Sequence, residues 1–223
     1  MESLSVYFSN LSLFQVWQGN FDLLLKAGMP EKQLKYFRSI CEVPPANTET
    51  IYKFLGNRNE PLFISLYGKR IAPELKRYNE DLLDHVDMVA ENLINADIGQ
   101  ELAIKFAVLS GIGKKYNYGT NDDIGAAALS AFVTGFWLRQ KLDDILAREI
   151  VAIIYGYQFP LTTWCIEKTP DGTPVNHRRE FYEDLLAFYD GDKRSYAIAM
   201  KTMKLIDILS ECDRKAKQDQ SLF

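Results

Sequence analysis

The segment Ile124–Leu138 contains no Asp, Glu, Lys or Arg. Charged residues end at Asp123 before it and resume at Arg139 after it. A helix that is apolar on every side lies in the middle of a globular protein or in a membrane, and a membrane span needs roughly 20 apolar residues. Because this segment is shorter, the sequence predicts that it is the central helix of an all-α globular protein.

Small residues follow one side of this predicted central helix. Ala127, Ala131 and Gly135 recur every four positions, which places them on one face of a helix. Larger apolar side chains such as Phe132 and Trp137 occupy the other faces. The pattern predicts that a neighbouring helix lies close to the small-residue face and that larger side chains fill the remaining space.

The rest of the chain predicts further helices around this one, in an irregular multi-helix bundle. Apolar residues at helical spacing predict one helix from about 13 to 27 and a long helix from Pro73 to about Asn95. Asp97 with Gln100 resembles a capping box for the next helix, which we expect to end at Gly111. Thr120 with Asp123 resembles a second capping box. With no repeat or linker, the sequence predicts a single domain over residues 1–223.

One passage favours β structure. Residues 161–168 include Thr162, Thr163 and Trp164, and the turn-forming run TPDGTP follows directly. We expect a small β-hairpin or extended arm near residues 161–176. The predicted arm that projects from the helical body spans residues 157–177.

Composition narrows the class of protein. The net charge is −4 and the pI is about 5.3, so there is no electrostatic case for binding nucleic acid or an anionic membrane. Cys41, Cys165 and Cys212 lack the spacing of a disulfide framework or a CxxC metal site. No basic segment precedes the apolar residues of the N-terminus, as a secretory signal would require. We therefore expect reduced thiols and a cytoplasmic protein that binds neither nucleic acid nor membrane.

The run Ser110–Thr120, SGIGKKYNYGT, is a candidate anion-binding loop. Two lysines stand among glycines before a helix whose free N–H groups point along its axis, which is where phosphates and carboxylates bind. The candidate groups are Lys114, Lys115 and Thr120. The run lacks the glycine and hydroxyl positions of a Walker A loop, and the sequence favours an ordinary capped connection between helices over an anion site.

Four carboxylates form a stripe on the long helix. Glu80, Asp84, Asp87 and Glu91 fall at spacings of four, three and four residues, with His85 beside them. They would supply half of a metal site, but no second helix carries matching acidic residues, and the stripe lies opposite the apolar face. The sequence therefore favours a solvent-exposed stripe and leaves open a nucleotide- or metal-dependent enzyme using residues 80–91 with the loop 110–120.

The predicted arm carries the residue types that anchor protein interfaces. These candidate partner-binding residues are aromatic or basic: Tyr157, Phe159, Trp164, His177, Arg178 and Arg179. No nucleophile, metal-ligand or cofactor motif accompanies them, so we expect no catalytic residue, metal or cofactor. The sequence favours a non-enzymatic, regulatory protein that binds a protein partner through the arm and the helical surface. It leaves open a homo-oligomer.

Overall fold

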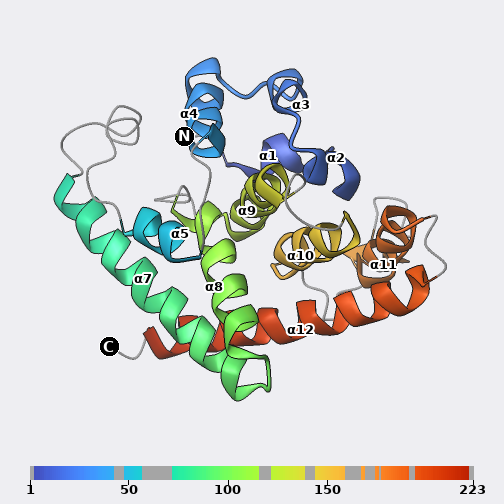
Figure 1. Cartoon of the computed structure of the whole chain (residues 1–223). Coiled ribbons are helices and arrows are strands. Elements are labelled where there is room, and N and C mark those ends of the chain that lie inside the picture. Colours follow the sequence, from blue (N-terminus) through green and yellow to red (C-terminus); the bar gives the residue numbers. More distant parts are fainter. Residues whose placement is uncertain are drawn as a thin grey trace.

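The structure is a computed structural model that describes residues 3–42, 48–56, 72–115, 122–138, 144–158, 167–168, 174–175, 177–190 and 194–220. The all-α prediction is confirmed, because eleven helices account for most of these residues (Figure 1). The helices are α1 Ser5–Phe8, α2 Leu13–Gln18, α3 Phe21–Lys26, α4 Glu31–Glu42, α5 Thr48–Leu55, α7 Ala72–Asn95, α8 Gln100–Lys114, α9 Asp123–Leu138, α10 Asp144–Gly156, α11 His177–Phe188 and α12 Ser195–Gln220.

Helix α9 is the central helix that the sequence predicts. Every residue from Gly125 to Gly135 is buried. The helix packs against α1, α2, α4, α8 and α10, which surround it in Figure 1. On its small-residue face, a Cβ added to Gly135 would lie 2.6 Å from the carbonyl oxygen of Trp17 in α2. The absence of a side chain at this position therefore lets two backbones approach closely.

The predicted helix over 13–27 is wrong as a single element, because it is two short helices. Gly19 ends α2 with a left-handed φ of 60°, and the Asn20 side chain caps α3 by accepting a hydrogen bond from the Asp22 N–H. A continuous helix would place Phe14 and Leu25 on its apolar face. In the structure the turn separates the two helices, and both side chains are exposed.

Asp122 joins the N-terminus to the start of α9. Its carboxylate accepts hydrogen bonds from the backbone N–H groups of Gly125 at 2.9 Å and Ser5 at 2.7 Å, and also from the Ser3 hydroxyl. Burial alone would raise the pKa of Asp122. The hydrogen bonds from these donors lower it by more, so the net pKa is below its ordinary value. One carboxylate therefore caps α9 and holds α1 against it. The Thr120 of the predicted capping box lies outside the described residues.

Helix α8 differs from its prediction at both ends. It begins after Gly99, without a side-chain cap, and Asp97 adopts a left-handed φ of 61° instead of forming a capping box. It continues past Gly111 to Lys114, so these residues are not a loop. A Cβ on Gly113 would overlap the backbone carbonyl of Ala126 in α9. These glycines allow helix contact instead of ending the helix.

The long helix α7 packs against α8, and the long helix α12 packs against α7 and α10, on the side away from α1–α4 (Figure 1). Both long helices contribute apolar side chains to the core, since Leu82, Val86 and Val89 of α7 and Ile206 and Leu209 of α12 are buried. None of the helices in the described part of the chain has the length and apolar character needed to cross a bilayer.

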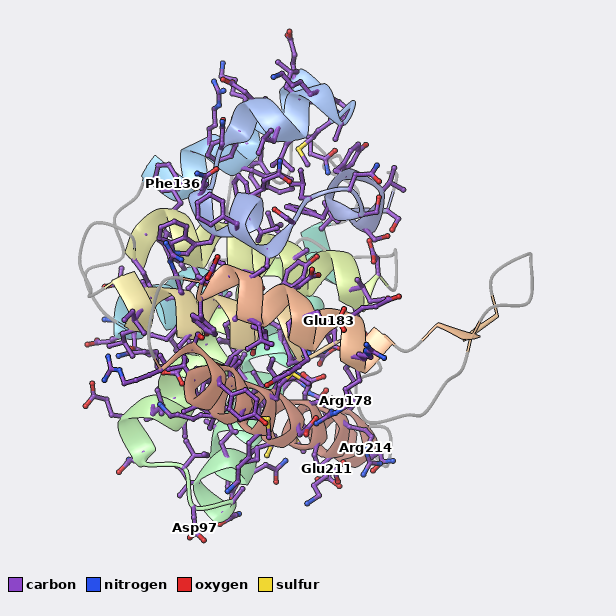
Figure 2. The ribbon with its side chains drawn as sticks, turned by 90° about the vertical axis from the view of Figure 1, so that its right-hand side faces the viewer. Asp97, Phe136, Arg178, Glu183, Glu211 and Arg214 are labelled. Carbon is purple, nitrogen blue, oxygen red and sulfur yellow. The ribbon has the colours of Figure 1, made fainter. Side chains whose placement is uncertain are left out.

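The predicted hairpin near residues 161–176 is not borne out. Of the residues described in this segment, two on each side pair, as antiparallel strands β1 Glu167–Lys168 and β2 Pro174–Val175. Figure 2 shows this ladder to one side of the helices. The remainder of 159–176 lies outside the described residues.

Candidate functional site

Lys114, a candidate of the predicted anion loop, lies inside the protein. It ends α8 with a side chain that is 7% exposed. Its ammonium donates to the Asp213 carboxylate of α12 and to Nε2 of His85 in α7, at 2.7 Å for the histidine. Because an ammonium only donates, Nε2 of His85 accepts from Lys114 and the proton of a neutral ring is on Nδ1. The same nitrogen lies 2.9 Å from Oδ1 of Asp213, so the Lys114 ammonium bridges two acceptors.

A second set of groups completes this cluster around Asp213. Gln158 donates to Oδ2 of Asp213 at 2.8 Å, and Lys217 lies 3.2 Å from the same oxygen. Lys217 also pairs with Asp123 at the start of α9, at 2.7 Å. We call His85, Lys114, Gln158, Asp213 and Lys217 the buried charge cluster. When His85 is neutral, the two positive charges of Lys114 and Lys217 balance the negative charges of Asp213 and the adjoining Asp123.

The electrostatics of the cluster favour this protonation state. Burial would raise the pKa of Asp213, but Lys114, His85 and Lys217 outweigh it and hold that pKa well below its usual range. Burial lowers the pKa of His85, the Asp213 carboxylate 2.9 Å from Nε2 opposes this, and Lys114 adds to the lowering. The pKa of Lys114 is lowered by its burial, while Asp213 counteracts that effect. We assign a carboxylate, two ammonium groups and a neutral imidazole.

The buried charge cluster joins helices α7, α8 and α12 to Gln158, which lies two residues beyond the end of α10. Its polar atoms are directed to one another, as buried ions require. Nothing in this arrangement presents Lys114 to an external anion. We assign the cluster a role in holding the helices together.

Lys115, the neighbouring candidate, has a different structural role. Its ammonium donates to the backbone carbonyl of Phe54 at 2.5 Å and lies over the Phe54 ring, 4.5 Å from the centroid. It also donates to the Leu55 carbonyl at 3.4 Å. Both carbonyls lie at the C-terminal end of α5, where the helix dipole favours a positive charge. The anion-binding role of Lys114, Lys115 and Thr120 stays a prediction that this placement does not support, and Thr120 lies outside the described residues.

The acidic stripe of α7 faces solvent. Glu80, Asp84, Asp87 and Glu91 are exposed, whereas His85 points to the opposite side, into the cluster. Asp87 accepts a hydrogen bond from the Tyr52 hydroxyl at 2.8 Å. Among the described residues, no group of three or more His, Cys, Asp or Glu side chains is placed to hold a metal ion.

The predicted partner-binding residues are not together on one described surface. Tyr157 is 1% exposed and belongs to the core, so it is not part of a projecting arm. Arg178 makes a double hydrogen bond to Asp207 of α12, at 2.7 and 2.8 Å, which raises its pKa, and Arg179 pairs with Glu183 (Figure 2). His177 begins α11. Phe159 and Trp164 lie outside the described residues.

A groove of about 740 Å³ opens where α2, α3 and α4 meet the end of α9. We call it the aromatic groove. Its lining residues are Trp17, Gln18, Gly19, Asn20, Phe21, Asp22, Arg38 and Phe136. Figure 2 shows Phe136 beside the N-terminal helices.

Contacts among the rings shape the apolar part of the aromatic groove. Phe21 packs edge-on against Phe136, with ring centroids 6.0 Å apart, and Gly19 touches Phe136 where a side chain would cover it. Behind the groove, the Arg148 guanidinium lies 4.6 Å from the Trp17 ring centroid and donates to the Phe188 carbonyl at 2.6 Å. The apolar surface is therefore held by packed rings instead of by mobile side chains.

The rim of the aromatic groove is polar. Arg38 lies over the Phe21 ring, 5.4 Å from its centroid, and pairs with Asp22 at 3.4 Å. Both charged side chains are substantially exposed, so this ion pair contributes little to stability. An aromatic centre with a polar rim that includes arginine is typical of protein-binding surfaces.

Sequence reasoning missed the aromatic groove because Trp17 and Phe21 fit the apolar stripe of a continuous helix. The available signal was Gly19 followed by Asn20, a helix stop followed by a capping residue. It also missed Asp213, although Ile206, Leu209, Asp213 and Ala216 follow one helical stripe. An acidic residue in such a stripe needs a buried partner.

Comparison of the chain with protein-family models, with curated proteins and with solved structures found no match. The class of the protein is therefore given by its own fold, an all-α bundle around α9.

Proposed function

We propose that this protein is a non-enzymatic, regulatory protein that binds a protein partner, and that the aromatic groove receives an apolar side chain of that partner. The observation that carries the proposal is the groove itself, an open groove of about 740 Å³ in which the rings of Trp17, Phe21 and Phe136 lie among polar groups. Anchoring side chains of protein partners bind in pockets of this composition.

The size of the interaction sets a further condition on the partner. Burying one large apolar side chain stabilises a complex by about 1.5–3 kcal/mol, which is too little for a specific complex by itself. The partner must therefore also contact the surface around the groove. Phe14 of α2 supports this, since it is exposed and its ring lies 5.5 Å from that of Trp17, which lines the groove.

The arm remains a separate part of the proposal. The described base of the arm is tied to the helical body, because Arg178 is held by Asp207. We propose that Phe159, Trp164 and His177 add to partner binding, as the sequence predicts. Deleting residues 161–176 tests this point: a deleted protein that is folded and keeps every partner would remove the arm from the binding surface.

We also propose that the protein works in a reducing compartment, in accordance with the cytoplasmic location that the sequence predicts. Cys212 supports this, because it is buried and takes no part in a disulfide within the described part of the chain. Buried free thiols persist where disulfide exchange is suppressed.

Site-specific photo-crosslinking in the cells that make the protein tests the role of the groove. A benzophenone amino acid replaces Gln18 on the groove rim, and a matched control places it at Glu101, which is exposed at the start of α8. We expect a discrete crosslinked protein from position 18 and none of the same mass from position 101.

A third protein combines the probe at Gln18 with Phe136→Ala, which removes the ring from the groove wall. We expect this change to weaken the crosslink while circular dichroism shows an unchanged fold. The same products from Gln18 and Glu101, or a crosslink that is insensitive to Phe136→Ala in a folded protein, would contradict the proposal.

A further inference from the structure

His85 occupies a position in which a proton would disrupt its surroundings. Its side chain is 6% exposed, and Nε2 accepts a hydrogen bond from the Lys114 ammonium at 2.7 Å. A protonated ring cannot accept this bond, because both of its nitrogens then carry protons. Protonation would also place two positive charges side by side in a buried site, where Coulomb repulsion is strong.

The charged groups around His85 come from two neighbouring helices. Lys114 faces it from α8, and Asp213 and Lys217 face it from α12. Helix α5 also packs on α7, but its Tyr52 donates to a carboxylate on the solvent side of α7. Among these described groups, Asp213 alone would attract an imidazolium, since its Oδ1 lies 2.9 Å from Nε2 of His85. That oxygen already accepts from the Lys114 ammonium, and Oδ2 accepts from Gln158.

We propose that His85 is an acid sensor whose protonation releases the C-terminal half of α12 from α7 and α8. Leu209, Cys212 and Ala216 are buried along this half, and its other polar contacts are few. Asn92 of α7 donates to the Cys212 carbonyl at 3.3 Å, and Gln220 donates to the Asp81 carbonyl at 2.9 Å. The cluster is therefore the main polar connection along this half of α12.

The sign of the effect follows from linkage. Burial lowers the pKa of His85 below the 6.5 of an exposed imidazole. In an open form, where the ring reaches water, the histidine binds a proton near pH 6.5, while the closed form does not. The closed form therefore loses stability relative to the open form as the pH falls below about 6.5. The equilibrium constant for opening rises by up to tenfold per pH unit.

This device lies away from the aromatic groove. The groove is formed by α2–α4 and the end of α9, whereas α7, α8 and α12 meet on the other side of the molecule (Figure 1). The proposal therefore does not rest on the proposed function.

Hydrogen–deuterium exchange of the full chain at about pH 5, 6 and 7, corrected for intrinsic exchange, tests the proposal. We expect the amides from Leu209 to Ala216 to exchange up to tenfold faster per pH unit below about 6.5. His85→Gln, whose amide oxygen accepts from Lys114 but does not titrate, should abolish the acceleration. His177→Gln, the matched change at the other histidine, should leave it intact.

Two results would overturn the proposal: exchange that is independent of pH in the wild type, or acceleration that persists in His85→Gln. If His85→Gln does not fold, an NMR titration of the wild-type histidine rings decides instead. A His85 ring that titrates at or above pH 6.5 while the protein is folded would overturn the proposal, and titration below that value, together with loss of α12 protection, supports it.

Discussion

The contact between α8 and α9 at Gly113 supports a quantitative test of the central-helix packing. A Cβ at this position would overlap the Ala126 carbonyl oxygen and lie 2.6 Å from its carbon atom. In the same contact, the Ser130 hydroxyl accepts from the Gly113 N–H at 2.7 Å and donates to the Ser110 carbonyl at 3.1 Å. Because the obstructing atoms are backbone, no side-chain rotation can relieve the overlap.

The expected cost of Gly113→Ala follows from three contributions. Overpacking a core costs typically about 1–3 kcal/mol, and a rigid backbone obstacle places this change at the upper end. Separating the helices also breaks the bond to Ser130 and strands buried polar groups, at about 1–2 kcal/mol. Alanine recovers about 1 kcal/mol through its higher helix propensity. We therefore expect a net loss of about 3 kcal/mol in the free energy of unfolding.

Urea denaturation followed by circular dichroism measures this free energy. Gly99→Ala is the matched control, because a Cβ at Gly99 would meet nothing within 4 Å, and we expect it to cost less than about 1 kcal/mol. A Gly113→Ala protein within about 0.5 kcal/mol of the wild type would refute the close approach of α8 and α9.

Three further predictions concern other contacts. Gly135→Leu should lower the free energy of unfolding by about 3 kcal/mol in urea denaturation, because its side chain meets the backbone of Trp17, and an unchanged midpoint would contradict that packing. Asp122→Ala should cost about 1–2 kcal/mol and increase amide exchange in α1, which it holds. Lys114→Met should lower the free energy of unfolding by about 3 kcal/mol, because it leaves Asp213 without its main cation. Adding Asp213→Leu should recover part of that loss. Additive costs in this double-mutant cycle would contradict a direct pair.

Glycine explains why the end of α8 differs from its prediction. In a single sequence, Gly111 and Gly113 are typical of a loop, because glycine commonly ends helices. In the structure both are helical, and their missing side chains accommodate Val86 and Leu55 at one position and α9 at the other. A glycine that ends a helix and a glycine that admits a neighbour leave the same local pattern.

The buried charge cluster illustrates the same limit for charged residues. Lys114 and Asp213 are 99 residues apart in the sequence, and His85 and Asp213 are 128 apart. Local spacing placed Lys114 in a candidate anion site and His85 beside an acidic stripe. Only the packing of α7, α8 and α12 selects their common partner.

The amino-acid sequence was sufficient to predict the all-α class, the central position of α9 and the long helix that became α7. These features depend on apolar periodicity within one helix, which is a local property of the chain. The aromatic groove and the pairing of His85 with Lys114 were decided by tertiary structure. Each depends on contacts between segments distant in sequence, and the free energy of such contacts is set by how the helices pack rather than by the spacing of residues along the chain.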